Sequence, residues 1–246
     1  MNKKHFCLTA LALLLAVPAF AADRKVPDPL ASGLTGPQRL QALVDRVRLE
    51  QQKLKTLEAR FVQQQESSLL AEPEESSGLF SYAAPDRVRW EYQSPTPITV
   101  VVRGDEMTTW YRDLKRAETL KIGRYSNQVF KYLGASGSLD TLLQYFVVKL
   151  ALPKANGEPY RLELIPKYPR IKKRLRTMTL WIDAERFFPT RLKYVEADGD
   201  VTEYRFTDLK MNPKIPGDRF VLNLPKGVDT KVIDLGREPE EPRSRP

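Results

Sequence analysis

The 246-residue chain has a formal net charge of +9 and contains one histidine, His5, and one cysteine, Cys7. Both lie in the first 21 residues, so removal of that segment would leave a chain with neither residue type. Such a chain cannot use Ser-His or Cys-His nucleophilic catalysis, His/Cys zinc sites or disulfides. A basic balance is typical of proteins that meet nucleic acid, anionic membranes or acidic partners, and for an exported chain we expect no nucleic acid.

The first 21 residues have the pattern of a secretory signal. Lys3 and Lys4 form a positive start, residues 6–17 are apolar, and Ala19-Phe20-Ala21 offers the small-x-small sequence of a cleavage site. The apolar run is shorter than the roughly 20 residues that span a bilayer. We expect cleavage after Ala21, which removes two lysines and lowers the net charge to +7, and a soluble protein in the periplasm.

The rest of the chain divides by composition. Residues 22–34 are polar and contain proline, which is typical of a flexible leader. Residues 236–246 are charged and proline-rich, which indicates a disordered tail. Between these ends we find no internal repeat and no linker, so we expect residues 35–235 to form a single domain.

A long amphipathic helix is expected first. Thr35 is suited to cap its start and Pro37 to occupy its first turn. Apolar residues then recur at helical spacing, which predicts one helix of about 24 residues with one face to bury. The residues on that face are Leu40, Leu43, Val44, Val47, Leu54, Leu57 and Phe61.

From about residue 60 the apolar period changes to two, which predicts strands. The clearest strand is 87–92, where Val88, Trp90 and Tyr92 point one way and the charged residues point the other. The turn at Asp198-Gly199 is a strong hairpin signal. The expected strands are 78–83, 87–92, 98–103, 106–112, 116–122, 160–165, 175–183, 190–197, 201–209 and 220–224.

Two short helices are expected between these strands, at 125–133 and at 138–146. The second carries an apolar stripe of Leu139, Leu142, Leu143 and Phe146. Sheets with many strands curl, and a curled antiparallel sheet has one apolar face on which amphipathic helices can pack. We therefore predict an α+β fold: an incomplete antiparallel barrel of about ten or eleven strands, with the long helix and the short helices as a lid over an apolar cavity.

The densest basic run is 167–176, with the sequence KYPRIKKRLR. Charge runs are commonly solvated turns, and this one has the position of a hairpin connection. A docking patch for an acidic partner or a lipid headgroup is the alternative interpretation. The candidate docking residues are Arg87, Arg89, Lys172 and Lys173.

Several segments in order resemble the LolA family of periplasmic lipoprotein carriers, from about residue 37 to 232. They are Phe61-Val-Gln-Gln64, Gly78-Leu-Phe-Ser-Tyr82, the run from Pro85 to Pro95, Gly104-Asp105 with Trp110-Tyr111, the run from Tyr160 to Lys167, Leu180-Trp-Ile-Asp183, Thr202 to Phe206, and Phe220 to Val228. The resemblance implies an incomplete barrel closed by helices. It further implies a carrier that takes an acylated lipoprotein from an inner-membrane transporter to an acceptor at the outer membrane.

One position departs from the family pattern. The resemblance implies an arginine before Pro85 that pins the lid, and here this residue is Ala84. Two other cargo-related functions of the same fold stay open: a carrier for a glycolipid or pigment-lipid export pathway, and a regulator that senses lipoproteins.

The candidate site is the apolar face of the sheet. Its predicted lining is Val88, Trp90, Tyr92, Val100, Val102, Met178, Leu180, Ile182, Tyr204 and Phe206, and the predicted lid residues are Leu142, Leu143 and Phe146. Shielding an acyl chain requires no catalytic group, so we expect a monomeric carrier without cofactor or metal and not an enzyme. A hydrolase would need two facing carboxylates, and a glycan-binding protein would need exposed aromatic platforms.

Overall fold

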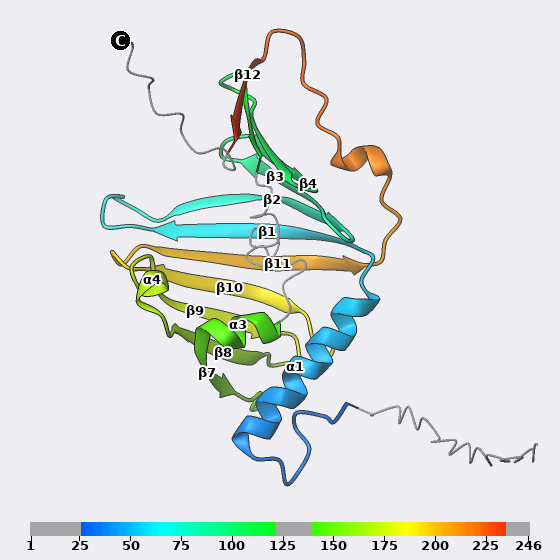
Figure 1. Ribbon diagram of the computed structural model, residues 1–246, viewed down its shortest axis with the longest axis vertical. Helices are drawn as coiled ribbons and strands as arrows, with labels where there is room; N and C mark the ends of the chain where they lie inside the picture. The colour runs from blue at the N-terminus through cyan, green and yellow to red at the C-terminus, as the bar shows by residue number, and fades with distance from the viewer. Residues whose placement is uncertain (1–25, 122–138, 235–246) are drawn as a thin grey trace, which may run out of the picture.

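The computed structural model describes residues 26–121 and 139–234 and contains a single twelve-stranded sheet (Figure 1). The strand order is β12-β6-β5-β4-β3-β2-β1-β11-β10-β9-β8-β7. All neighbours in this order are antiparallel except β12 and β6, which are parallel. The predicted α+β fold with a curled, unclosed sheet is confirmed, with twelve strands in place of the expected ten or eleven.

The elements have the following bounds. The strands are β1 (Thr56–Glu66), β2 (Glu74–Ala83), β3 (Arg87–Ser94), β4 (Ile98–Arg103), β5 (Glu106–Tyr111), β6 (Arg116–Lys121), β7 (Phe146–Ala151), β8 (Tyr160–Pro166), β9 (Leu175–Ile182), β10 (Pro189–Glu196), β11 (Val201–Met211) and β12 (Asp229–Asp234). The helices are α1 (Gly36–Lys53), α3 (Leu139–Tyr145), α4 (Pro169–Lys172) and the 3₁₀ helix η2 (Gly217–Phe220).

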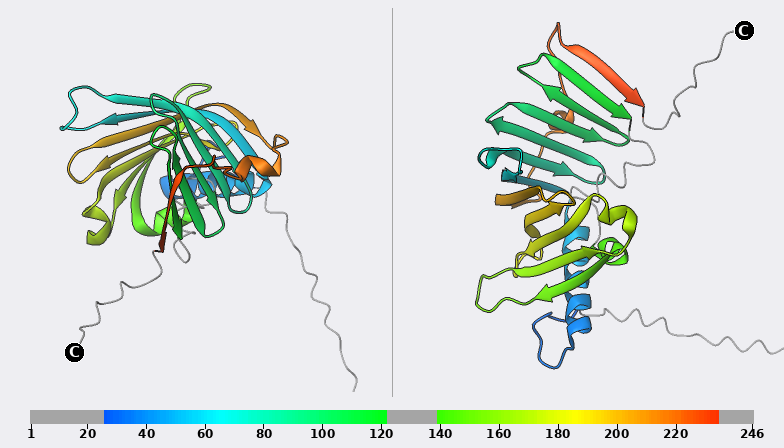
Figure 2. Two further views of the ribbon diagram at one scale, coloured as in Figure 1. Left: turned by 90° about the horizontal axis from the view of Figure 1, so that it is seen from above. Right: turned by 90° about the vertical axis from the view of Figure 1, so that its left-hand side faces the viewer.

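The sheet arches over α1, which lies on its concave side (Figure 2). The helix begins where expected, and the side chain of Gln38 accepts a hydrogen bond from the Thr35 N–H at 2.9 Å. Its inward stripe includes Leu43, Val44 and Val47, all nearly inaccessible to solvent. These side chains pack on residues of β8 and β9 in the first core cluster, so α1 covers the β7–β10 half of the sheet.

The long helix is shorter than expected, because it ends at Lys53 and residues 56–66 form β1. The spacing of four between Leu57 and Phe61 fits a helix and a strand equally well. In the strand, Leu57, Ala59 and Phe61 are buried in alternation. Pairing of β1 with both β2 and β11 decides between the two periods, and it places β1 at the centre of the sheet.

The second core cluster belongs to the other half of the sheet. It contains Phe61, Phe80, Tyr82, Val88 and Trp90 with further buried residues of β1 to β4. None of the α1 residues in the first cluster reaches it. Two apolar clusters therefore line one concave face, and the space between them is where a cavity can form.

Two further sequence expectations were wrong, and a third lies outside the described residues. Phe146 opens strand β7 and does not end a helix, because the chain there pairs with β8. Residues 220–224 form no strand: Phe220 closes η2, and the last strand is β12. The helix expected at 125–133 lies outside the described residues. Within the described ranges, no helix is long and apolar enough to cross a membrane.

Candidate functional site

A cavity of about 890 Å³ lies on the concave face of the sheet. This size falls within the roughly 300–1,000 Å³ typical of ligand pockets. Residues from both core clusters line it, so it runs between the two halves of the sheet. Val100, Tyr204 and Phe206 are only half-buried although they sit on the concave side, which leaves apolar surface exposed to the cavity.

Strand alternation builds the cavity wall. In β3 the lining residues are Val88, Trp90 and Tyr92, and the residues between them do not contribute. The same alternation holds in β4, β9 and β11. All ten residues predicted from the sequence line the cavity: Val88, Trp90, Tyr92, Val100, Val102, Met178, Leu180, Ile182, Tyr204 and Phe206. Their binding of lipid stays a prediction.

Trp90 is the centre of an aromatic cluster in this wall. Its ring centroid lies 4.8 Å from that of Phe80, 5.2 Å from that of Phe61 and 5.5 Å from that of Tyr204. These arrangements are tilted or edge-to-face, the geometry that aromatic pairs prefer. Phe206 completes the cluster at 5.9 Å from Trp90. The wall here is aromatic and closely packed.

Polar groups in the apolar part of the wall are few, and the buried Nε1 of Trp90 has no hydrogen-bond partner among the described residues. The Tyr92 hydroxyl donates to Oε1 of Gln63 at 2.8 Å. Burial raises the pKa of the Tyr204 hydroxyl far above its usual range, and the adjacent Tyr92 and Tyr194 add to this effect. Tyr204 therefore stays neutral at any physiological pH. Among the described residues of the lining, Glu196 is the sole carboxylate.

Of the three predicted lid residues, one lies in the cavity lining. Phe146 is buried and lines the cavity from β7. Leu143 packs against the first core cluster without lining the cavity, and the side chain of Leu142 lies outside the described part of the chain. Leu139 of α3 and Val47 and Gln51 of α1 line the cavity as well.

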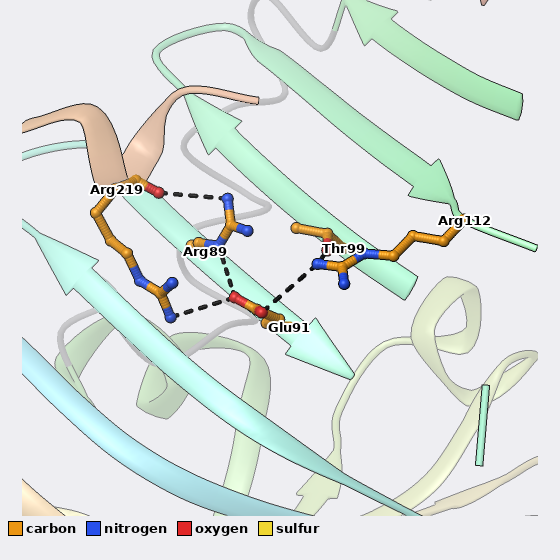
Figure 3. A network of polar contacts seen from close by, with 5 residues as sticks. All are labelled: Arg89, Glu91, Thr99, Arg112 and Arg219. Atoms are coloured by element: carbon orange, nitrogen blue, oxygen red, sulfur yellow. Dashed lines mark hydrogen bonds and ion pairs between the residues drawn. The ribbon is translucent and has the colours of Figure 1, made fainter. Parts of the chain in front are cut away.

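The predicted docking residues of β3, Arg87 and Arg89, alternate with the cavity-lining residues Val88 and Trp90 and so lie on the outer face. Figure 3 shows Arg89 with its polar neighbours. Nε of Arg89 contacts the Glu91 carboxylate at 2.9 Å, and Arg219 and Arg112 contact it at 3.2 and 3.6 Å. Arg87 lies over the Phe220 ring at 5.4 Å. These side chains hold η2 against the sheet, so their freedom to bind a partner is restricted.

Burial alone would raise the pKa of Glu91, but hydrogen bonding to Arg89 and the charges of Arg89, Arg219 and Arg112 outweigh it and hold the pKa below its usual value. Glu203 has the same environment, because Arg191 and Arg205 contact it at 2.7 and 2.6 Å. Its pKa is lowered as well, against the effect of burial. These carboxylates are structural.

The other two predicted docking residues, Lys172 and Lys173, lie in the connection that contains α4, between β8 and β9. Both are exposed, and Lys173 also lines the cavity together with Arg170 and Arg174. Sequence reasoning identified the basic run but did not place it at the cavity. It also missed Leu57, Ala59, Phe80, Leu192 and Tyr194 as lining residues, although alternation within their strands could have indicated them.

Within the described ranges, no group of histidine, cysteine, aspartate or glutamate side chains has the arrangement of a metal site. The fold and the site together define the class: an incomplete barrel whose concave face encloses an apolar cavity. The sequence profile described as "Outer membrane lipoprotein carrier protein LolA" matches residues 52–223. The chain belongs to this LolA family, whose members are carriers rather than enzymes.

Individual relatives are similar over most of the chain. An outer-membrane lipoprotein carrier protein of Pseudomonas putida (strain GB-1) is 26% identical over 229 residues, which cover 93% of this chain and 98% of the relative. The protein of that name from Alkalilimnicola ehrlichii is 29% identical over 186 residues, covering 74% and 78%. A solved structure of an uncharacterized conserved protein from Thermus thermophilus has a TM-score of 0.51 at 13% identity, over 79% of this chain and 99% of that one, which supports the fold alone.

Proposed function

We propose that the protein is a periplasmic carrier that shields the acyl chains of a lipoprotein in its cavity and passes it from the inner towards the outer membrane. The observation that carries this proposal is the cavity of about 890 Å³ with its nearly continuous apolar wall. Shielding is energetically demanding, because each CH₂ contributes about 0.8 kcal/mol. A 14-carbon chain therefore costs on the order of 10 kcal/mol to expose.

The proposed direction of transport and the proposed periplasmic location are supported by the relatives and by the N-terminal sequence, respectively. The relatives bear the name outer-membrane lipoprotein carrier protein, and residues 1–21 have the pattern of a secretory signal with a cleavage site after Ala21. A donor transporter in the inner membrane and an acceptor at the outer membrane are the partners that such transport requires. Residues 35–235 act as one carrier domain in this proposal, since all twelve strands belong to one sheet.

Binding without covalent chemistry fits the composition of the wall. The cavity lining described above is made mostly of aliphatic and aromatic side chains. The hydroxyl of Tyr92 is hydrogen-bonded, and that of Tyr204 stays protonated because burial raises its pKa. Cargo would be held by burial and released when a partner offers its acyl chains a competing apolar surface. The protein itself then remains unchanged through each cycle, as a chaperone does.

The proposal is tested by mixing the mature protein with a triacylated lipoprotein and with the same lipoprotein lacking its acyl chains. Gel filtration without detergent should show a soluble one-to-one complex with the acylated form alone. Equal binding of both forms would assign recognition to the polypeptide of the cargo and would contradict the cavity as the carrier site. Binding of neither form would contradict the carrier function itself.

A further inference from the structure

A group of cations borders the cavity at the connection between β8 and β9. Residues 167–176 contain six lysines and arginines and no acid. Three of these residues, Arg170, Lys173 and Arg174, line the cavity and are also exposed to solvent. The connection therefore marks a mouth of the cavity, where the apolar wall meets water and positive charge collects.

The backbone of this connection is fixed to the sheet. Ile171 and Leu175 pack against the first core cluster. The Ala197 N–H donates to the carbonyl of Arg174 at 3.1 Å, and Nη2 of Arg176 donates to the carbonyl of Ala197 at 3.0 Å. Apolar anchors and hydrogen bonds thus hold the backbone of the turn, and with it the backbone positions of the three cations, at the mouth.

The charged ends of Arg170, Lys173 and Arg174 make no hydrogen bond or ion pair with the described part of the chain. The contrast with the outer face is clear, since Arg89 there is paired with the partly buried Glu91, and Arg191 and Arg205 are paired with the buried Glu203. At the mouth, Glu196 is the one carboxylate of the described lining. Three cations against one carboxylate leave the mouth positive and able to take an anion.

We propose that Arg170, Lys173 and Arg174 form a subsite for the phosphate-bearing headgroup of a lipid whose acyl chains fill the cavity. This inference rests on the acyl-binding cavity of the proposed function and extends its cargo from lipoproteins to acylated molecules with an anionic group beside the chains. Arginine pairs with phosphate through two parallel hydrogen bonds, and lysine adds a point charge. Chains held against Trp90 and Leu180 would leave the headgroup at the mouth, within reach of these side chains.

The experiment compares two lipids that differ by one phosphate: 1-myristoyl lysophosphatidic acid and 1-monomyristoylglycerol. Each displaces a fluorescent fatty-acid probe from the delipidated mature protein. The wild type should bind the phosphate-bearing lipid about tenfold more tightly, the magnitude of one partly screened charge-assisted hydrogen bond. In the variant Arg170→Gln/Lys173→Gln/Arg174→Gln the two affinities should agree within about twofold, because the phosphate-bearing lipid loses its advantage.

Two controls separate the subsite from general charge. The triple variant Lys210→Gln/Lys214→Gln/Lys226→Gln removes the same charge from exposed residues outside the cavity lining and should keep the preference. Lys172→Gln, in the same connection but outside the lining, should keep it as well. If either control loses the preference as the mouth variant does, the effect is long-range electrostatics and the subsite is wrong.

The remaining outcomes distinguish failure of the subsite from failure of the proposed function. Equal affinity of the wild type for both lipids would overturn the subsite and leave the acyl cavity intact, whereas failure of both lipids to bind would overturn the proposed function with it. Millimolar inorganic phosphate should leave the lipid bound, and displacement by it would indicate a site for free anions. Binding to anionic phosphatidylglycerol vesicles without uptake of their lipid would assign the cations to membrane docking instead.

Discussion

The ring of Phe61 lies against Gly78, its cross-strand neighbour between β1 and β2. A Cβ on Gly78 would stand 3.0 Å from the edge of that ring and 1.9 Å from the carbonyl oxygen of Glu91 in β3. No side chain fits there without moving backbone. This close approach lets three central strands pack tightly beneath the aromatic wall of the cavity.

Gly78→Ala should therefore lower the free energy of unfolding by about 2–4 kcal/mol, through overpacking against backbone. Urea denaturation measures the effect. Gly217→Ala is the matched control, because a Cβ there meets nothing within 4 Å, and it should change stability by less than about 0.5 kcal/mol. A Gly78→Ala variant as stable as the control would show that β3 can shift freely.

Filling the cavity should abolish uptake while the fold survives. Val100 is half-buried and lines the cavity, so Val100→Trp would place a large ring in open space instead of forcing a packed core apart. We expect affinity for a fluorescent fatty acid to fall at least about tenfold, with the thermal midpoint kept.

Val147→Trp serves as the control for this change, because Val147 is 52% exposed on β7 and lies outside the lining. It should bind the fatty acid as the wild type does. Unchanged affinity in Val100→Trp would mean that the acyl chain lies elsewhere.

Trp90 offers a direct optical report of occupancy. Of the three tryptophans it alone lines the cavity, while the rings of Trp110 and Trp181 lie under Arg112 and Arg191 at 4.9 and 4.1 Å. In a Trp110→Phe/Trp181→Phe background, a fatty acid brominated along its chain should quench the fluorescence of Trp90. The single variant Trp90→Phe should lose most of this quenching. Quenching that persists in it would place the chain at another tryptophan.

The Glu91 network makes stability depend on pH in the acid range. The pKa of the Glu91 carboxyl in the folded protein lies below the ordinary value of 4.5. The contribution of this carboxylate to folding stability is therefore complete above pH 4.5 and is lost as the pH falls through the folded pKa. Glu91→Gln should cost about 1–3 kcal/mol at pH 7, with a difference from wild type that shrinks below about pH 4.5.

Urea midpoints measured from pH 7 to acid check this dependence, with Glu106→Gln as an exposed control. A cost of Glu91→Gln that stays constant with pH would show that the carboxylate is not charged in the folded state.

The sequence predicted the concave face well, because alternation in strands such as 87–92 fixes which side chains share a face. It failed where two periods coincide, since the spacing of Leu57 and Phe61 suits a helix as well as a strand. It also failed for β12, a polar edge strand whose parallel partner β6 lies about a hundred residues earlier. Only long-range pairing determines such elements.

The sequence predicted the strand residues of the candidate site but not the residues at its mouth. Residues on strands were placed correctly at the cavity by period alone. The mouth was not, because Arg170, Lys173 and Arg174 lie in a connection whose direction depends on Ile171, Leu175 and the hydrogen bonds to Ala197. The basic run was visible in the sequence, but its contact with the cavity is a product of tertiary packing.

The carrier function is tested by native mass spectrometry with lipid extraction, on the mature protein isolated from a periplasm. We expect a bound acylated species, whose mass distinguishes a lipoprotein from a phosphate-bearing lipid. Protein that emerges empty, and that also fails to take a fluorescent fatty acid into its interior, would contradict the carrier function.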